Sequence, residues 1–289
     1  CIRDSLKLES WQRTGSFKVR GALNKLSTLS PDVRAQGVVT ASAGNHGLGV
    51  AHAGQVLGMS SVVVFVPVDA PTSKVERLAG YACEVRLAGA DYGAAHVLAD
   101  AYAQERESVY ISAYDDPVVI AGQATAVLEL MEALPDVDTL MVPVGGGGLI
   151  AGAAVVAKAI NPAVSIIGIQ PEASPAAKLS LRDGRPYETY EAAPTICDGL
   201  AGGFGRVPFE MAADLIDDVL VVTEEAVRHS VGWLLSHEQL VVEGAGAIAI
   251  APLLTGQLDA THRSVAAILT GRNLDASLLR EILSEYREP

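Results

Sequence analysis

Cysteine, aromatic residues and positive charge are all scarce in this sequence. The three cysteines, Cys1, Cys83 and Cys197, are odd in number and widely spaced, which argues against a disulfide framework or a metal knuckle and indicates a reducing compartment. The formal net charge is −13 and no basic stripe is present, so we expect no nucleic-acid partner. No segment has the apolar length of a membrane span and no signal peptide is visible, so we expect a cytoplasmic protein without a membrane partner.

Apolar residues and glycine are abundant instead. Hydrophobic residues make up 49% of the 289 residues, enough for one large or two medium domains with a sizeable core. The apolar pattern alternates between short runs and helical periods along the chain. Strands are expected at 38–40, 61–67, 85–87, 109–112, 139–144, 164–169, 219–222 and 264–270, and helices at 71–81, 91–105, 117–134, 149–160, 224–236 and 246–254. This alternation predicts parallel sheets covered by helices on both faces.

Lys18 lies in an unusual setting, at the centre of Thr-Gly-Ser-Phe-Lys-Val-Arg-Gly. Small residues let the backbone approach a ligand closely, and a partly desolvated amine has a lowered pKa and becomes a nucleophile. Such an amine can form a Schiff base with an aldehyde cofactor. The octapeptide alone also fits a surface lysine that precedes an amphipathic helix.

A second small-residue turn covers 41–47, with the sequence Ala-Ser-Ala-Gly-Asn-His-Gly. It follows an expected strand and precedes a helical pattern. Free N–H groups at a helix N-terminus attract an anion such as a carboxylate, and Asn45 and His46 add polar side chains to the same turn. Taken alone, His46 would more often be a structural histidine.

Four consecutive glycines, Gly145 to Gly148, connect an expected strand to an expected helix. Successive N–H groups in such a loop can converge on a phosphate. The loop is not a P-loop, because no Gly-Lys-Ser/Thr follows it. Ala151 replaces the third glycine of the dinucleotide fingerprint, so a weak dinucleotide interpretation stays open, as does a simple tight turn.

Thr270 ends the last expected strand and is followed by Gly-Arg-Asn. Its hydroxyl is therefore expected at the carboxyl end of a sheet strand, where α/β proteins bind ligands. Hydroxyl residues at strand ends commonly serve only to start a turn, so this signal is weak by itself.

Together these segments resemble the fold-type II pyridoxal-phosphate enzymes, and within them the serine/threonine dehydratase and serine racemase group. The similarity runs in order from about Leu6 to Asn273. The segments that carry it are 16–22 for the Schiff-base motif, 42–46 for the substrate-carboxylate loop and 145–148 for the phosphate loop, with 115–125 and 198–201 in support.

The resemblance implies a fold, a cofactor and an assembly. The expected fold is α/β and similar to the tryptophan synthase β chain, with two three-layer α/β/α domains and mostly parallel sheets. Residues 1–37 and 116–289 would form the large domain that binds pyridoxal 5′-phosphate, and 38–115 a small mobile domain. The cofactor would lie in the cleft between them, and the protein would be a homodimer. Because the group has a helix and a strand before this point, we expect a segment to precede Cys1.

The resemblance also implies which residues contact the cofactor. Lys18 would hold its aldehyde and then act as the base, and Thr270 would face the ring nitrogen. A neutral hydroxyl there makes a weaker electron sink than a carboxylate would, which favours prompt elimination. The cofactor contacts are expected to be Phe17, Lys18, Asn45, Gly145, Gly146, Gly147, Gly148 and Thr270. The substrate carboxylate would be held by Ser42, the Ala43 N–H, Asn45 and His46.

Departures from the racemases indicate the reaction. Ala43 stands where they have a serine that delivers a proton from the face opposite the lysine, so racemisation is disfavoured. Tyr114 lies at a position that is aromatic in threonine dehydratases. Gln170 and Ala176 occupy positions where the racemases have two carboxylate ligands of a divalent cation. A hard cation needs such ligands, so we expect no metal at that site.

The resulting hypothesis is an ammonia-lyase whose partner is a small amino acid. It would dehydrate an L-β-hydroxy amino acid, such as threonine, serine or a relative, to a 2-oxo acid and ammonia. Two alternatives stay open. One is a racemase, a β-replacement enzyme or a threonine synthase on the same scaffold. The other is a cofactor-binding or nucleotide-binding protein without catalytic activity.

Overall fold

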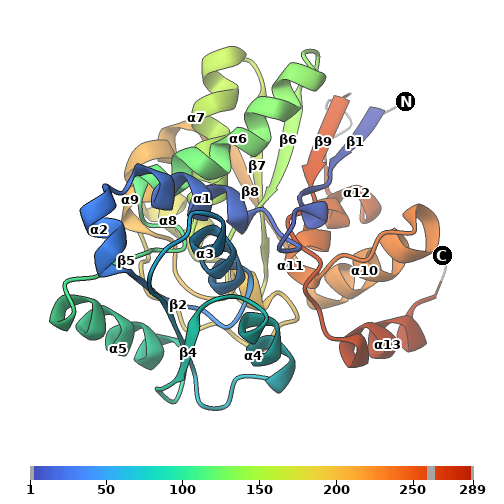
Figure 1. Ribbon diagram of the computed structural model, residues 1–289. Coiled ribbons are helices and arrows are strands. Elements are labelled where there is room, and N and C mark those ends of the chain that lie inside the picture. The colour runs from blue at the N-terminus through green and yellow to red at the C-terminus, as the bar shows by residue number, and fades with distance from the viewer. Residues whose placement is uncertain (1–2, 259–263, 288–289) are drawn as a thin grey trace. The chain divides into compact units, whose positions relative to one another are not determined.

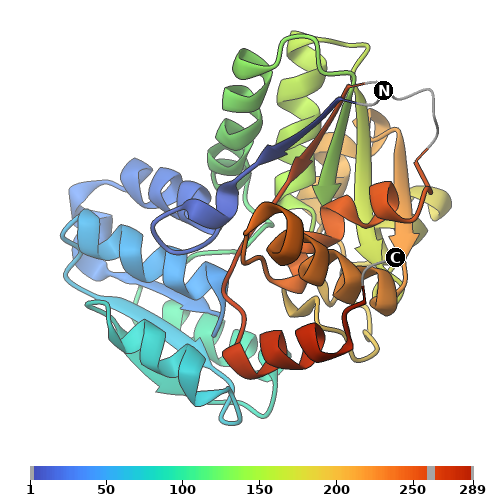
Figure 2. The same ribbon diagram turned by 90° about the vertical axis from the view of Figure 1, so that its right-hand side faces the viewer.

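A sheet of five parallel strands organises the larger of two structural units. The strands are β1 (Arg3–Lys7), β6 (Thr139–Pro143), β7 (Ser165–Pro171), β8 (Asp218–Val222) and β9 (Ser264–Ile268). Their order is β1-β9-β6-β7-β8, and every neighbouring pair is parallel. The computed structural model describes residues 3–258 and 264–287. In Figure 2, β1 in blue runs beside β9 in red.

Side-chain alternation along these strands builds two cores, one on each face of the sheet. Leu140 and Val142 of β6 face one core, whereas Met141 between them faces the other. The first core is covered by α6 (Pro117–Ala133), α7 (Gly148–Ile160) and α9 (Arg206–Ala212). The second is covered by α10 (Glu224–Glu238) and α12 (Ala251–Leu254), with α13 (Ala276–Glu285) packed on α10 (Figure 1).

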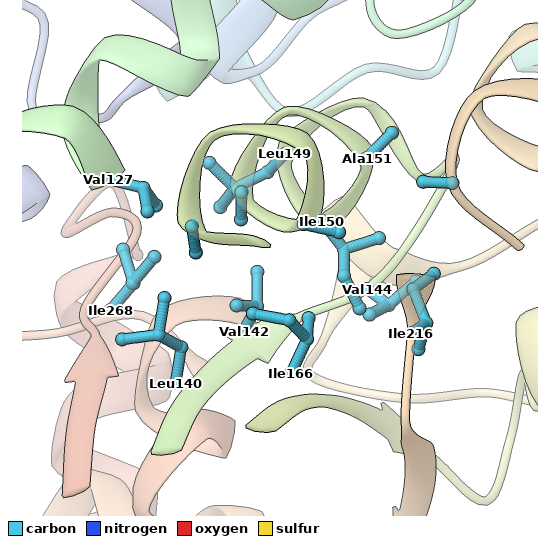
Figure 3. Packing of buried hydrophobic residues seen from close by; sticks show 14 of the residues in the cluster. Val127, Leu140, Val142, Val144, Leu149, Ile150, Ala151, Ile166, Ile216 and Ile268 are labelled. Carbon is cyan, nitrogen blue, oxygen red and sulfur yellow. The ribbon is translucent and has the colours of Figure 1, made fainter. Parts of the chain in front are cut away.

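Figure 3 shows side chains of the first core that come from a helix and from the strands below it. Leu149 and Ile150 of α7 lie over Val142 of β6 and Ile166 of β7. Because this packing involves the first turn of α7, it holds the helix N-terminus at the end of β6, directly after the glycine loop.

One expected helix of the larger unit is interrupted. The apolar stretch 246–254 forms α11 (Gly244–Ala247), a 3-10 turn η4 (Ile248–Ile250) and then α12. Pro252 has no N–H to donate to the preceding turn, so a continuous α-helical ladder cannot pass through this point. The remaining elements of this unit are α8 (Ala176–Asp183) and the 3-10 turns η1 (Glu9–Trp11), η2 (Asp198–Leu200) and η3 (Ala213–Leu215).

The smaller unit has its own parallel sheet, in the order β4-β3-β2-β5. Its strands are β2 (Val38–Ala41), β3 (Val62–Val66), β4 (Glu84–Leu87) and β5 (Val109–Tyr110). One face is covered by α1 (Lys18–Thr28), α3 (Asn45–Val56) and α4 (Thr72–Ala79), and the other by α5 (Tyr92–Glu105). The short helix α2 (Pro31–Gln36) precedes β2. Both sheets therefore confirm the prediction of parallel strands between helical layers.

The two units divide the chain at different points from those expected. The smaller unit is Lys18–Ala113, and the larger contains the chain up to Phe17 and from Tyr114 onward. Helices α1 and α2 thus belong with β2, because Ala22 and Leu26 of α1 share a core with Leu48 and Val50 of α3. Among the described residues, no helix has the length and apolarity needed to cross a bilayer.

Candidate functional site

Lys18 is the first residue of α1, and its amine is enclosed although the side chain is only half-buried. The Nζ atom donates to the main-chain carbonyl of Ala113 at 2.9 Å. Desolvation by burial lowers the pKa of Lys18 from 10.5 to about 8. The amine is therefore neutral, and nucleophilic, at a much lower pH than an ordinary lysine.

This pKa shift gives a direct prediction for the protein without cofactor. The fraction of neutral Lys18 should rise with pH through a midpoint near 8 rather than 10.5. Formaldehyde and cyanoborohydride methylate only neutral amines, so the methylation rate of Lys18, followed by peptide mass analysis, should show this midpoint. The same protein unfolded in urea is the control, where the midpoint should return to the ordinary lysine range. A midpoint above 10 in the folded protein would contradict the assignment.

His46 lies in the first turn of α3 and is only 4% exposed. Its Nε2 atom is 2.9 Å from the carbonyl oxygen of Ile111. Because a carbonyl can only accept, Nε2 must carry the hydrogen, which leaves Nδ1 as a bare acceptor. Nδ1 is buried without a partner among the described residues. Desolvation and the nearby charge of Lys18 lower the pKa of His46 to about 3, so the ring is neutral.

This tautomer bears on the role expected for His46 at the substrate carboxylate, which stays a prediction. A carboxylate is also an acceptor, so the bare Nδ1 lone pair would repel it. In this tautomer, the main-chain N–H groups in the first turn of α3 are better donors for a carboxylate than the imidazole is. The sequence could not reveal this, because the tautomer depends on the Ile111 carbonyl at the end of another strand.

The turn before α3 is tightly built around its small residues. The Ser42 hydroxyl accepts from the Gly44 N–H at 3.2 Å. A Cβ atom on Gly47 would overlap the Ser42 carbonyl oxygen, so only glycine fits there. A Cβ on Gly44 would meet nothing within 4 Å, which shows that the turn is open on that side. Ser42, Ala43 and Asn45 thus lie at the N-terminus of α3, a position that favours a small anion.

The glycine loop connects the end of β6 to α7 in the larger unit. The main-chain N–H groups of Gly145, Gly146 and Gly147 donate to no group in the described part of the chain. Protein atoms pack against the other side of the loop, where a Cβ on Gly146 would overlap the ring of Tyr114. Gly147 adopts a left-handed conformation, with φ of 96°. Together with Gly148 at the start of α7, the loop is suited to bind a phosphate.

Thr270 lies at the carboxyl end of β9, as expected, and is buried. Its hydroxyl donates to the carbonyl of Ala245 at 3.1 Å, so it has lone pairs left to offer to a ligand. Its own carbonyl accepts from the Phe17 N–H at 3.0 Å. Beside it, the Ser16 hydroxyl is buried without a partner in the part of the chain that the structure describes.

The predicted site residues fall into two sets, one in each unit. Phe17, Gly145, Gly146, Gly147, Gly148 and Thr270 belong to the larger unit, and Lys18, Ser42, Ala43, Asn45 and His46 to the smaller. The Ala113 and Ile111 carbonyls, which accept the Lys18 and His46 hydrogen bonds, could not be predicted from the sequence. Main-chain atoms have no residue-type signal, so only a structure can assign them.

At the position of the racemase cation site, the structure shows an internal hydrogen-bond network. The Gln170 amide donates through Nε2 to the Val144 carbonyl at 3.3 Å, and its oxygen accepts from the Lys178 N–H at 3.1 Å. Among the described residues, no group of three or more His, Cys, Asp or Glu side chains could hold a metal ion. The absence of a cation there stays a prediction.

Comparisons with a family model and with curated proteins agree on one family. The family model described as "Pyridoxal-phosphate dependent enzyme" matches residues 5–271. An L-threonine ammonia-lyase from Thermotoga maritima is 42% identical over 281 residues, which cover 97% of this chain and 69% of the relative. The catabolic L-threonine dehydratase TdcB from Escherichia coli K12 is also 42% identical, over 96% of this chain and 84% of its own.

Solved structures show the same fold. The processed form of threonine deaminase isoform 2 from Solanum lycopersicum has a TM-score of 0.92 and 33% identity, covering 98% of this chain and 78% of its own. Serine racemase from Dictyostelium discoideum has a TM-score of 0.88 and 32% identity, covering 95% of this chain and 88% of its own. Because a deaminase and a racemase both superpose well, the fold alone does not select the reaction.

Proposed function

This chain belongs to the pyridoxal-phosphate dependent enzyme family, and we propose that it is an ammonia-lyase for L-β-hydroxy amino acids. The substrate would be threonine, serine or a relative, and the products a 2-oxo acid and ammonia. The observation that carries the proposal is the enclosed amine of Lys18, whose pKa of about 8 fits it for covalent attachment and proton transfer. The threonine ammonia-lyase and dehydratase names of the 42%-identical relatives support the same reaction.

The residues present fit the cofactor. Gly145, Gly146 and Gly147 have N–H groups free for its phosphate, and Lys18 offers a nucleophilic amine for its aldehyde. Thr270 offers hydroxyl lone pairs at a strand end. We assign Phe17 and Asn45 to the cofactor ring and its 3′-oxygen on the strength of the family resemblance.

The chain's own residues would then perform the proton transfer. The cofactor, when bound, accepts the electrons released at the substrate Cα. Lys18 Nζ takes the proton from Cα, while the Ala113 carbonyl accepts a hydrogen bond from the same nitrogen and orients its lone pair. The Ser42 hydroxyl and the first-turn N–H groups of α3 hold the substrate carboxylate. His46 stays neutral beside Lys18, because its pKa lies near 3, and adds no positive charge that would repel an ammonium substrate.

Elimination is favoured over racemisation by the chemistry at position 43. Racemisation needs a proton donor on the face opposite Lys18, and Ala43 has only a methyl group there. Loss of the β-hydroxyl as water also needs a proton, but this proton can come from the same face, where Lys18 Nζ holds the one it takes from Cα. The proposal includes no divalent cation, because both ends of the Gln170 amide are already used within the fold. We also propose a cytoplasmic homodimer, as is usual for the group that the sequence resembles.

The test is a screen of L-threonine, L-serine and other β-hydroxy amino acids for release of 2-oxo acid by the holoenzyme. We expect oxo acid from at least one of them, and none from a Lys18→Ala control. Formation of the D-enantiomer without oxo acid would overturn the lyase assignment in favour of a racemase. A colourless protein that ignores added pyridoxal phosphate would favour a binding protein without this activity.

A further inference from the structure

A gap in the hydrogen-bond ladder lies immediately before the glycine loop. Strands β6 and β7 pair with Pro143 opposite Ile169, and the Val144 N–H donates to the Ile169 carbonyl at 2.9 Å. In a parallel ladder, the Val144 carbonyl should next accept from the N–H of residue 171. That residue is Pro171, which has no N–H. The last carbonyl before Gly145 therefore lacks its regular donor.

The side chain of Gln170 fills this gap. Its Nε2 atom donates to the Val144 carbonyl at 3.3 Å, and the residue is 0% exposed. A buried carbonyl without a donor would be destabilising, and the amide supplies that donor. A single residue next to the proline thus supplies the hydrogen bond that the proline cannot.

The other end of the same amide compensates for a second defect. Helix α8 begins after Pro175, which has no side chain that could cap the free N–H groups of the first turn. The Gln170 Oε1 atom accepts from one of them, the Lys178 N–H, at 3.1 Å. Since a carbonyl only accepts and an N–H only donates, these two partners also fix the orientation of the amide.

The Val144 carbonyl matters because it shares a peptide unit with the Gly145 N–H. A trans peptide is planar, and its C=O and N–H point in opposite directions. The Gln170 amide holds the Val144 carbonyl on its own side. The Gly145 N–H, which is the first of the glycine loop, therefore points away from Gln170. Gly145 also packs closely against Gly199, because a Cβ atom added at position 145 would lie only 2.9 Å from the Gly199 carbonyl oxygen.

We propose that Gln170 is a positioning residue for the phosphate loop, which it aligns through the Val144–Gly145 peptide while anchoring the loop to α8. The proposal rests on the proposed function, because it takes the phosphate of pyridoxal phosphate as the ligand of Gly145 to Gly148. Gln170 itself touches no ligand. Its contribution should therefore appear only in ligands that carry a phosphate.

The experiment compares two cofactor forms in a Gln170→Met variant, which keeps the side-chain volume and removes both hydrogen bonds. Binding of pyridoxal phosphate and of pyridoxal, which lacks the phosphate, is followed by the absorption of the lysine-linked form. We expect the Kd for pyridoxal phosphate to rise by about tenfold or more and the Kd for pyridoxal to change by less than about twofold. Ser230→Ala is the matched control, because it removes a buried hydrogen bond to the Ala226 carbonyl in α10.

The outcomes distinguish a failure of the positioning role of Gln170 from a failure of the proposed function. Equal loss of both ligands in Gln170→Met, or no loss of either, overturns the positioning role. If wild-type protein binds neither form, it is the proposed function that fails. Unchanged pyridoxal binding also shows that the variant is folded.

Gln170→Glu provides a second test if the Gln170→Met variant does not fold. The introduced carboxylate can still accept from the Lys178 N–H. Its other oxygen, however, would lie against the Val144 carbonyl oxygen, and two acceptors repel each other. Protonation would restore the donor. We therefore expect the ratio of variant to wild-type Kd for pyridoxal phosphate to fall toward one as the pH is lowered. A ratio that does not change with pH would contradict the proposal.

Discussion

Replacing Lys18 with alanine is expected to abolish turnover and the absorption band of the lysine-linked cofactor. The amine is assigned both the covalent attachment of the cofactor and the removal of the α-proton, and nothing else in the variant can perform the first task. The Ala113 carbonyl would lose its donor, but it cannot act as a base. Loss of a positioned base alone costs up to about 10⁴-fold, so the combined loss should leave no measurable rate.

Two controls distinguish a chemical defect from a structural one. Lys18→Arg keeps the positive charge, yet the guanidinium stays protonated and cannot attack an aldehyde, so it should be equally inactive. Lys18→Ala removes an amine whose charge is disfavoured by burial, so its thermal unfolding midpoint should not fall. A Lys18→Ala protein that retains both the absorption band and oxo-acid release would refute the assignment.

Gly146→Ala is expected to have the second-largest effect, for a purely steric reason. A Cβ at this position would overlap the ring of Tyr114, with ring carbons well under 3.0 Å away. Either Tyr114 or the loop must shift, and a displaced loop no longer presents its N–H groups to a phosphate. We expect a loss of about 1–3 kcal/mol in the free energy of unfolding and a large increase in the Kd for pyridoxal phosphate.

The clash can be tested by removing its other partner. If the ring is the obstacle, Tyr114→Ala combined with Gly146→Ala should bind the cofactor better than the sum of the two single losses predicts. Gly93→Ala is the control, because a Cβ on this glycine of α5 would meet only the Asp91 carboxylate at an ordinary distance of 3.4 Å. Wild-type binding by Gly146→Ala alone would contradict the packing described here.

The sheets were predictable because their central strands are buried on both faces. The apolar runs at 61–67 and 139–144 have no helical period, and both form central strands, β3 and β6. The break in the expected helix at 246–254 was missed, because the apolar pattern was given more weight than Pro252, which interrupts the ladder. The structure groups α1 with the smaller unit, where Leu26 shares a core with Leu48 of α3, and such tertiary packing has no local signal in the sequence.

For the proposed site, the sequence suggested residues that would act through their own chemistry, but not the groups that only the fold places. Lys18 and the glycines were recognisable from their neighbours along the chain. The roles of His46 and Gln170 depend on which carbonyl groups the fold brings to them, those of Ile111 and Val144. Strand register places these carbonyls, and one residue of slippage would change the partners completely.

The most direct test of this account is to reduce the freshly prepared holoenzyme with borohydride, digest it and map the modified peptide by mass. The account predicts one pyridoxyl adduct, on the Nζ atom of Lys18 within residues 14–21. An adduct on a different lysine, or the absence of any adduct in protein that had been loaded with pyridoxal phosphate, would contradict it.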